Sequence, residues 1–190
     1  MSQNIFLLVG LGNPGEKYKS TKHNFGFLTI DQIVSDYNLS AEGSKFNSHI
    51  FTGNISNEKI IAIKPQAFMN CSGNPVKLAM NFYKIPIENI VVFHDDLDVA
   101  LGRIKIKIGG GNAGHNGLRD LDQMIDSNYL RVRLGIGRPE NSSYEIANYV
   151  LSNFNNEEMK EVSSVNQKIS KLLPLIFEKK FNDFSNNFYL

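Results

Sequence analysis

The chain has 190 residues, of which 42% are hydrophobic, so it can bury one core of ordinary size and we expect a single domain over residues 1–190. Its net charge of +1 excludes attraction to nucleic acid or membranes by overall charge alone, so any anion-binding site must be local. The single cysteine, Cys71, cannot form an internal disulfide, the N-terminus lacks a signal-peptide pattern, and no apolar run approaches ~20 residues. These features predict a cytoplasmic protein that does not associate with membranes.

Hydrophobic periodicity predicts strands alternating with helices along the whole chain. The first elements are a strand over residues 5–11, a helix over 25–34, a loop over 41–47, a hairpin of strands over 48–55 and 59–63, and a helix over 74–84 capped by Ser72. The later elements are strands over 90–93, 103–108 and 131–134, helices over 116–125, 144–151 and 157–181, and a polar tail over 182–190. Pro174 is expected to kink or split the longest helix. This alternation predicts an α/β fold, with helices on both faces of one mixed sheet.

Gly10, Gly12 and Gly15 have the spacing of a dinucleotide-binding turn. That motif requires a helix at the third glycine to receive the pyrophosphate, but residues 16–24 are polar and have no apolar face. Asp31 stands near the distance expected of a ribose-binding acid, yet it falls inside a helical pattern. A small-molecule dehydrogenase is therefore the weakest of the functions considered.

Ionisable residues follow the strand predicted over residues 90–93, beginning with His94, Asp95 and Asp96. Such groups at the carboxyl end of a buried strand are typical of a ligand crevice in an open α/β sheet. With Asp98 they could also form a metal site, but no second ligand cluster of defined spacing supports it, so we predict no required metal. The following glycine-rich turn either cradles phosphate through its N–H groups or only lets the chain turn tightly.

The strands predicted over residues 103–108 and 131–134 alternate cations with aliphatic residues. Cations are expected on one face of each strand, while the intervening isoleucines, valine and leucine point into the core. One cation of this kind could be an ordinary solvated side chain. Five of them on two strands favour a surface that binds a polyanion. They are Arg103, Lys105, Lys107, Arg131 and Arg133.

Three separated segments combine into one pattern. They read GLGNPG at residues 10–15 with Tyr18 and TKHN at 21–24, FMNCSG at 68–73, and HDDLD at 94–98 with GGGNAGHNG at 109–117. Together they resemble bacterial-type peptidyl-tRNA hydrolases, whose domain is about the size of this chain. The resemblance implies hydrolysis of the ester that joins a peptide to tRNA, by a cofactor-free monomer with a twisted mixed sheet that binds RNA but neither DNA nor membranes.

The resemblance also implies roles for matching residues. His23 would be the catalytic base and Asp95 its partner. The implied substrate-binding residues, which position the peptide and the attacking water or line the site, are Asn13, Tyr18, Met69, Asn70 and Asn116. The implied clamp on the tRNA 5′ phosphate is Lys107 and Arg133, with Arg103, Lys105 and Arg131 as candidates for further tRNA contacts. Lys22 departs from the family, which usually has arginine before the histidine, so it keeps the charge without the planar fork.

Residue chemistry supports these roles but leaves alternatives open. A histidine titrates near neutral pH and an acid can fix its tautomer, although His23 alone could be an idle loop residue and Asp95 a solvated turn acid. The asparagines could serve turns and helix starts instead of substrate. Cys71 could be a nucleophile, but it is more simply a small apolar residue near a helix start. A protein that only binds RNA would share the basic faces, and the presence of both His23 and Asp95 favours the hydrolase.

Overall fold

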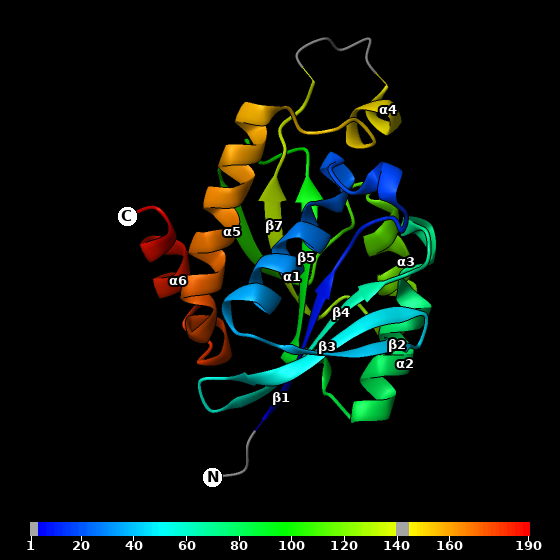
Figure 1. Cartoon of the computed structure of the whole chain (residues 1–190), viewed down its shortest axis with the longest axis vertical. Helices are drawn as coiled ribbons and strands as arrows, with labels where there is room; N and C mark the ends of the chain where they lie inside the picture. The colour runs from blue at the N-terminus through cyan, green and yellow to red at the C-terminus, as the bar shows by residue number, and fades with distance from the viewer. Residues whose placement is uncertain (1–3, 140–144) are drawn as a thin grey trace.

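A computed structural model of the chain describes residues 4–139 and 145–190. Its strands form one seven-stranded mixed sheet in the order β2-β3-β4-β1-β5-β7-β6 (Figure 1). The four central strands are parallel, and the strands at both ends pair antiparallel with their neighbours. The strands are β1 (Ile5–Gly10), β2 (Ser40–Lys45), β3 (Ser48–Ile55), β4 (Glu58–Pro65), β5 (Ile90–Asp96), β6 (Ile104–Ile108) and β7 (Leu130–Gly135).

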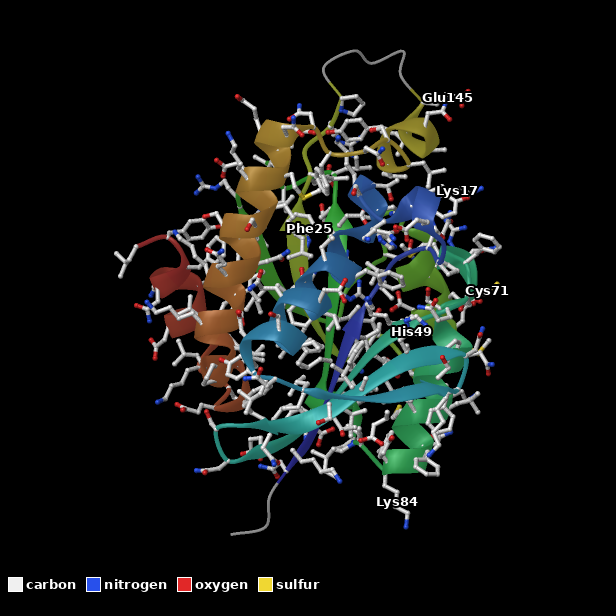
Figure 2. All side chains as sticks on the ribbon, in the orientation of Figure 1. Lys17, Phe25, His49, Cys71, Lys84 and Glu145 are labelled. Carbon is white, nitrogen blue, oxygen red and sulfur yellow. The ribbon has the colours of Figure 1, made fainter. Side chains whose placement is uncertain are left out.

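Helices cover both faces of the sheet, which confirms the predicted α/β architecture (Figure 1). Side chains alternate along a strand, so β1 sends Leu8 into the layer with α1 and α5, and Leu7 into the layer with α2 and α3. Figure 2 shows Phe25 in the interior, and Lys84 pointing outward after α2. The helices are α1 (Phe25–Asp36), α2 (Gly73–Tyr83), α3 (Asn116–Ile125), α4 (Ile146–Val150), α5 (Asn156–Phe177) and α6 (Phe181–Phe188).

Two glycines bring α1 against the carboxyl ends of the central strands. A Cβ added to Gly10 would lie 2.4 Å from the carbonyl oxygen of Gly26, and one added to Gly26 would lie 2.3 Å from that of Phe93. The first glycine of the GxGxxG spacing therefore serves close packing between a strand and a helix. This contact places the residues just before α1 beside the end of β5.

Residues 41–47 were expected to be a loop, but residues 40–45 form the edge strand β2. All six of its residues are exposed, so neither face carried the apolar alternation that identifies a strand. The polar tail forms α6, whose Phe184 and Phe188 are buried against α5. Ser72 does precede α2, but its hydroxyl donates to the carbonyl of Met69 instead of capping the helix.

Helix α5 contains Pro174 in its last turn and ends at Phe177, earlier than predicted. The predicted helix over residues 144–151 is observed as α4, which spans Ile146–Val150. Residue 144, where the prediction began, lies outside the described residues. In the described ranges, every helix is too short or too polar to cross a membrane.

Candidate active site

The site lies where the carboxyl ends of β1 and β5 meet the 3-10 turn Lys22–Asn24, which carries His23. Strand β5 runs further than predicted, so Asp95 is still hydrogen-bonded into the sheet and is buried. The turn is anchored from the distant C-terminal half, because the backbone N–H of Lys22 donates to the carbonyl of Ser152 at 3.0 Å. The position of His23 therefore depends on elements far apart in the sequence.

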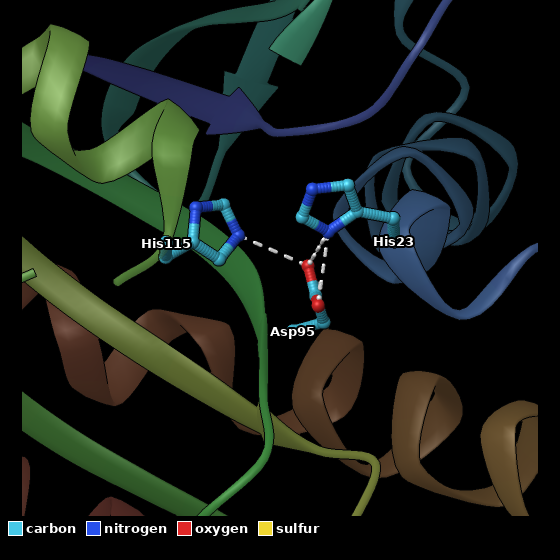
Figure 3. A group of neighbouring side chains, drawn as sticks. All are labelled: His23, Asp95 and His115. Atoms are coloured by element: carbon cyan, nitrogen blue, oxygen red, sulfur yellow. Dashed lines mark hydrogen bonds and ion pairs between the residues drawn. The ribbon is translucent and has the colours of Figure 1, made fainter. Parts of the chain in front are cut away.

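The carboxylate of Asp95 joins two histidines (Figure 3). His23 Nδ1 lies 2.9 and 3.0 Å from the two carboxylate oxygens, and His115 Nε2 lies 3.0 Å from Oδ1. The ring centroids of the two histidines are 4.9 Å apart. The predicted contact between His23 and Asp95 is confirmed, and the second histidine is an addition that sequence reasoning had not assigned to the site.

Hydrogen bonds determine which ring nitrogens carry protons. His115 caps α3, with its Nδ1 accepting the backbone N–H of Leu118 at 3.3 Å, so its proton lies on Nε2 and is donated to Asp95. A neutral His23 likewise donates from Nδ1 to the carboxylate. Its Nε2 is then left unprotonated, which is the form needed to accept a proton.

Charge and burial shift the pKa values of this group in opposite directions. Burial acts to lower the pKa of His23, but the charge and hydrogen bonding of Asp95 outweigh it and raise the pKa above its ordinary value of 6.5. Burial acts to raise the pKa of Asp95, whereas His23 and His115 hold it far below its ordinary value. Asp95 is therefore ionised at neutral pH, and His23 titrates above pH 6.5.

A cleft of about 480 Å³ opens over these residues. His23 and Asp95 lie on its wall together with the turn over residues 111–115, and Ile146 and Val150 of α4 supply apolar surface. The cleft also contains both cations and acids. Its charged lining residues, besides Asp95, are Asp96, Asp98, Lys107, Arg131, Arg133 and Arg138.

The predicted substrate-binding residues divide into two groups. Asn116, exposed at the start of α3, lines the cleft. Asn13 is buried: its Oδ1 accepts the backbone N–H of Met69 at 2.8 Å, and its own backbone N–H donates to Asn24 beside His23. Asn13 and Met69 thus support the turn that carries His23. The half-buried Tyr18 and the exposed Asn70, like Asn13 and Met69, lie outside the cleft lining in the described part of the chain.

The five predicted cations do not form one exposed face. The side chain of Arg131 is only 3% exposed and is paired with Asp122, because β7 is an inner strand with α3 over this face. Arg103 is exposed but lies over the ring of Tyr189 in the C-terminal segment, 4.8 Å from its centroid, away from the cleft lining. The prediction of an exposed basic surface is wrong for these two residues, although Arg131 does lie on the predicted sheet face, directly opposite Lys107.

Lys105, Lys107 and Arg133 lie on the same sheet face as Arg131, with Lys105 directly opposite Arg133. Lys105 and Lys107 are exposed, and of the two only Lys107 lines the cleft. On the opposite face of β6, Ile104 is in the core and the partly buried Ile106 packs against it, as predicted. Ile108, at the end of this edge strand, is 57% exposed.

Lys22, the departure from the family pattern, is buried and anchors the turn that carries His23. Its Nζ donates to Glu158 at 3.1 Å and to the carbonyl of Asn153 at 3.2 Å, and lies 5.1 Å from the ring centroids of both Tyr149 and Phe154. Glu158 in turn belongs to the capping box of α5. The lysine therefore ties His23 to the start of the longest helix.

The acids predicted as an alternative metal site are separated, since Asp96 and Asp98 pair with different arginines. Within residues 4–139 and 145–190, the group that could hold a metal ion is instead His23, Asp95 and His115, whose ligand atoms lie within 4.8 Å of one another. Two imidazoles and a carboxylate are a ligand set suited to zinc. The same three residues are also joined by hydrogen bonds, because both histidines donate to the carboxylate of Asp95.

The sequence signal for His115 was its place directly after a glycine-rich turn, at the start of a predicted helix. A capping histidine must turn its ring back toward the helix end, and here that brings Nε2 to Asp95. Periodicity cannot reveal this contact, because it joins residues 20 positions apart through a loop.

A histidine hydrogen-bonded to a buried carboxylate, on a cleft wall at the carboxyl edge of a mixed sheet, is an arrangement suited to activating water in a hydrolase. The sequence profile described as peptidyl-tRNA hydrolase matches residues 7–189. Similar curated proteins include the peptidyl-tRNA hydrolase of Rickettsia canadensis, 45% identical over 96% of this chain and 98% of the relative. Another, from Azorhizobium caulinodans, is 45% identical over 98% of this chain and 91% of the relative.

A solved structure agrees with the sequence matches. The crystal structure of peptidyl-tRNA hydrolase from Acinetobacter baumannii superposes with a TM-score of 0.91 and 34% sequence identity, covering 99% of this chain and 96% of that one. The chain belongs to the peptidyl-tRNA hydrolase family.

Proposed function

We propose that this protein hydrolyses the ester bond between peptide and tRNA, with His23 as the general base and Asp95 as the residue that orients it. The observation that carries the proposal is the buried His23–Asp95 contact at the wall of the cleft, which leaves Nε2 as the free ring nitrogen of the base. Family membership supplies the substrate class. The products are free tRNA and a peptide, which suits the recycling of tRNA after translation is aborted.

In the proposed mechanism, His23 Nε2 takes a proton from water as the oxygen attacks the ester carbonyl carbon. Asp95 stabilises the imidazolium that forms and keeps the ring in place. The tetrahedral intermediate then expels the ribose oxygen of the tRNA, which receives the proton from His23. No cofactor takes part in these steps.

Amide groups are proposed to hold the peptide and the developing oxyanion. Asn116 is placed for this at the cleft wall, and its neutral amide would not add charge near His23. Asn13 could contribute only its Nδ2 hydrogens, because its oxygen is already bonded to the backbone of Met69. Tyr18 and Asn70 would have to be reached by a peptide that extends beyond the cleft.

The tRNA end is proposed to bind where Lys107 and Arg133 enter the same cleft from neighbouring strands. Lys107 is exposed and the side chain of Arg133 is 23% exposed, so both are accessible to a phosphate. Arg131 is assigned instead to holding the turn over residues 111–115, because it donates to the carbonyl of Gly111. All of these groups come from one chain, so we infer that a monomer is active.

The deciding experiment measures release of an N-blocked amino acid from tRNA by the wild type, by His23→Ala and by His49→Ala. The third protein is a matched control, because His49 is an exposed histidine on β3. We expect His23→Ala to lower kcat by roughly 10²–10⁴-fold, the usual contribution of a general base, while tRNA binding and the control remain normal. Near-normal turnover by His23→Ala would overturn the mechanism. Binding of tRNA without release by the wild type would instead support a protein that only binds RNA.

A further inference from the structure

Three of the four cations that line the cleft are each paired with a carboxylate, but the pairs differ in which nitrogens they occupy. The guanidinium group offers five N–H donors, and what remains after pairing decides whether a phosphate can bind. The pairs are Arg131 with Asp122, Arg133 with Asp96, and Arg138 with Asp98, and the fourth cation is Lys107.

Arg131 and Arg138 each commit at least one terminal nitrogen. Arg131 donates from Nη1 to the carbonyl of Gly111 and from Nη2 to Asp122, both at 2.9 Å, and its side chain is 3% exposed. Arg138 donates to Asp98 from Nε at 2.9 Å and from Nη2 at 2.7 Å, with its side chain 61% exposed. The first arginine is closed to ligands, and the second forms an exposed surface ion pair that contributes little free energy.

Arg133 is held differently. It donates from Nε to Asp96 Oδ2 at 2.7 Å, and within the described residues its two terminal amino groups make no hydrogen bond. Asp96 is itself fixed, since its Oδ1 accepts the backbone N–H of Asp98 at 2.8 Å and its side chain is 8% exposed. Asp96 stands opposite Gly135 in the parallel β5–β7 pair, so it is a diagonal neighbour of Arg133 on the same sheet face.

We propose that Asp96 is a positioning residue for phosphate recognition: by accepting the Nε–H of Arg133, it orients both terminal amino groups of that arginine toward a phosphate monoester. Lys107 would contribute the second cation. It lies on β6, on the same sheet face as Arg133 and diagonal to it, and has no acidic partner within the described residues. The proposal rests on the assignment of Lys107 and Arg133 to the tRNA 5′ phosphate. A fixed guanidinium loses less side-chain entropy on binding than a free one.

The sign of the effect separates this role from simple electrostatics. Burial acts to raise the pKa of Asp96, but hydrogen bonds from Arg133 and from the backbone of Asp98 outweigh it and lower the pKa, so the group is an anion at neutral pH. An anion near a phosphate site weakens binding by repulsion. If Asp96 acted only through its charge, removing that charge would tighten binding of the phosphate. If it positions Arg133, removing it weakens binding.

The test compares Asp96→Asn with wild type on N-blocked aminoacyl-tRNA that either carries its 5′ phosphate or has been dephosphorylated. We expect KM to rise roughly 3- to 10-fold for the phosphorylated substrate, as expected for partial loss of a charge-assisted contact, with kcat unchanged. The dephosphorylated substrate should show little change. Asp98→Asn is the matched control, because it removes one carboxylate from the same cleft and leaves the bond between Asp96 and Arg133 in place.

A KM for Asp96→Asn that falls or stays the same on the phosphorylated substrate would overturn the proposal. So would an equal rise on both substrates or a parallel loss of kcat, since these indicate a structural role. If Asp96→Asn does not fold, Asp96→Glu replaces it, because the longer side chain keeps the charge but moves the carboxylate away from the position that holds the Nε–H of Arg133, and the same phosphate-specific rise is expected.

Arg133→Ala and Lys107→Ala on the same substrate pair test the underlying assignment. If neither variant distinguishes the two substrates, the phosphate clamp itself is wrong and the role of Asp96 falls with it. If both distinguish them while Asp96→Asn behaves like wild type, the clamp stands and only the positioning role is lost.

Discussion

Replacing Asp95 with asparagine tests how the buried carboxylate controls the catalytic base. The substitution keeps the size of the side chain and removes its charge. Two effects raise the pKa of His23 above 6.5, the charge of Asp95 and its hydrogen bond, whereas burial acts to lower it. In Asp95→Asn the charge is gone and burial remains, so the pKa of His23 should fall below 6.5. Since the base acts in its neutral form, the acidic limb of kcat/KM should move to lower pH.

The rate should fall as well. The asparagine oxygen can still accept the Nδ1 hydrogen of His23, so we expect loss of the charge-assisted part of the interaction, about 1.5–3 kcal/mol. At about 1.36 kcal/mol per factor of ten, this corresponds to a drop in kcat of roughly 10- to 150-fold, which lies mostly below the roughly 10²–10⁴-fold drop expected for His23→Ala. The charge on Asp95 therefore contributes less than the base itself.

The assay is release of an N-blocked amino acid from tRNA, measured between about pH 5 and 9 so that the acidic limb is covered. Two control variants isolate the cause. Asp98→Asn removes a half-exposed carboxylate three positions along the chain, and should leave the limb where it is in wild type. His115→Gln keeps the carboxylate but removes its second partner, so the limb should stay above pH 6.5 with a smaller loss of kcat. An acidic limb that stays in place in Asp95→Asn, or moves to higher pH, would refute the reasoning.

Four further outcomes are expected. Lys107→Ala and Arg133→Ala should each raise KM with kcat little altered and flatten the salt dependence of binding by about one unit of slope or less; loss of kcat at saturating substrate with normal affinity would contradict this. Lys22→Met should lower the free energy of unfolding by about 1–3 kcal/mol in denaturant titrations, because it leaves Glu158 without its buried cation. Lys22→Arg should be tolerated. Equal stability of Lys22→Met and wild type would count against the anchoring role of Lys22. Cys71→Ser should retain full activity, since Cys71 is exposed at the outer edge of the molecule (Figure 2), and a large loss would revive the nucleophile hypothesis. Treatment with a chelator should leave turnover unchanged, and loss that is restored by added metal would show that the histidine–carboxylate group holds an ion.

Several parts of this protein could be predicted because their causes are local. The continuous apolar run of β1 and the helical spacing of α1 reflect burial directly, and the hairpin of β3 and β4 was indicated by the turn residues between two strand-like segments. The acids after the apolar part of β5 marked the edge of the sheet that carries the site. Strand β2 was not predicted, because an exposed edge strand buries neither face and therefore has no periodic pattern of apolar residues.

The family resemblance extended these local signals to the catalytic pair, which periodicity alone could not have joined. His23 and Asp95 are 72 positions apart, and their contact depends on the close packing of α1 against β1 and β5. A single sequence contains the residues of such a contact but not the register that brings them together.

The charges of the cleft were decided by tertiary structure. Alternation along β7 correctly placed Arg131 and Arg133 on one face, yet the first is buried under α3 beside Asp122, and the second is held by Asp96 while its terminal amino groups make no hydrogen bond to the residues that the structure describes. Cations of identical spacing thus differ in accessibility, because accessibility depends on what packs above the sheet. The sequence by itself determined which residues could carry charge and which face of each strand they occupy. Only the packing of distant helices and loops decided which of those charges are neutralised, which remain available to a ligand, and which second histidine shares the carboxylate of Asp95.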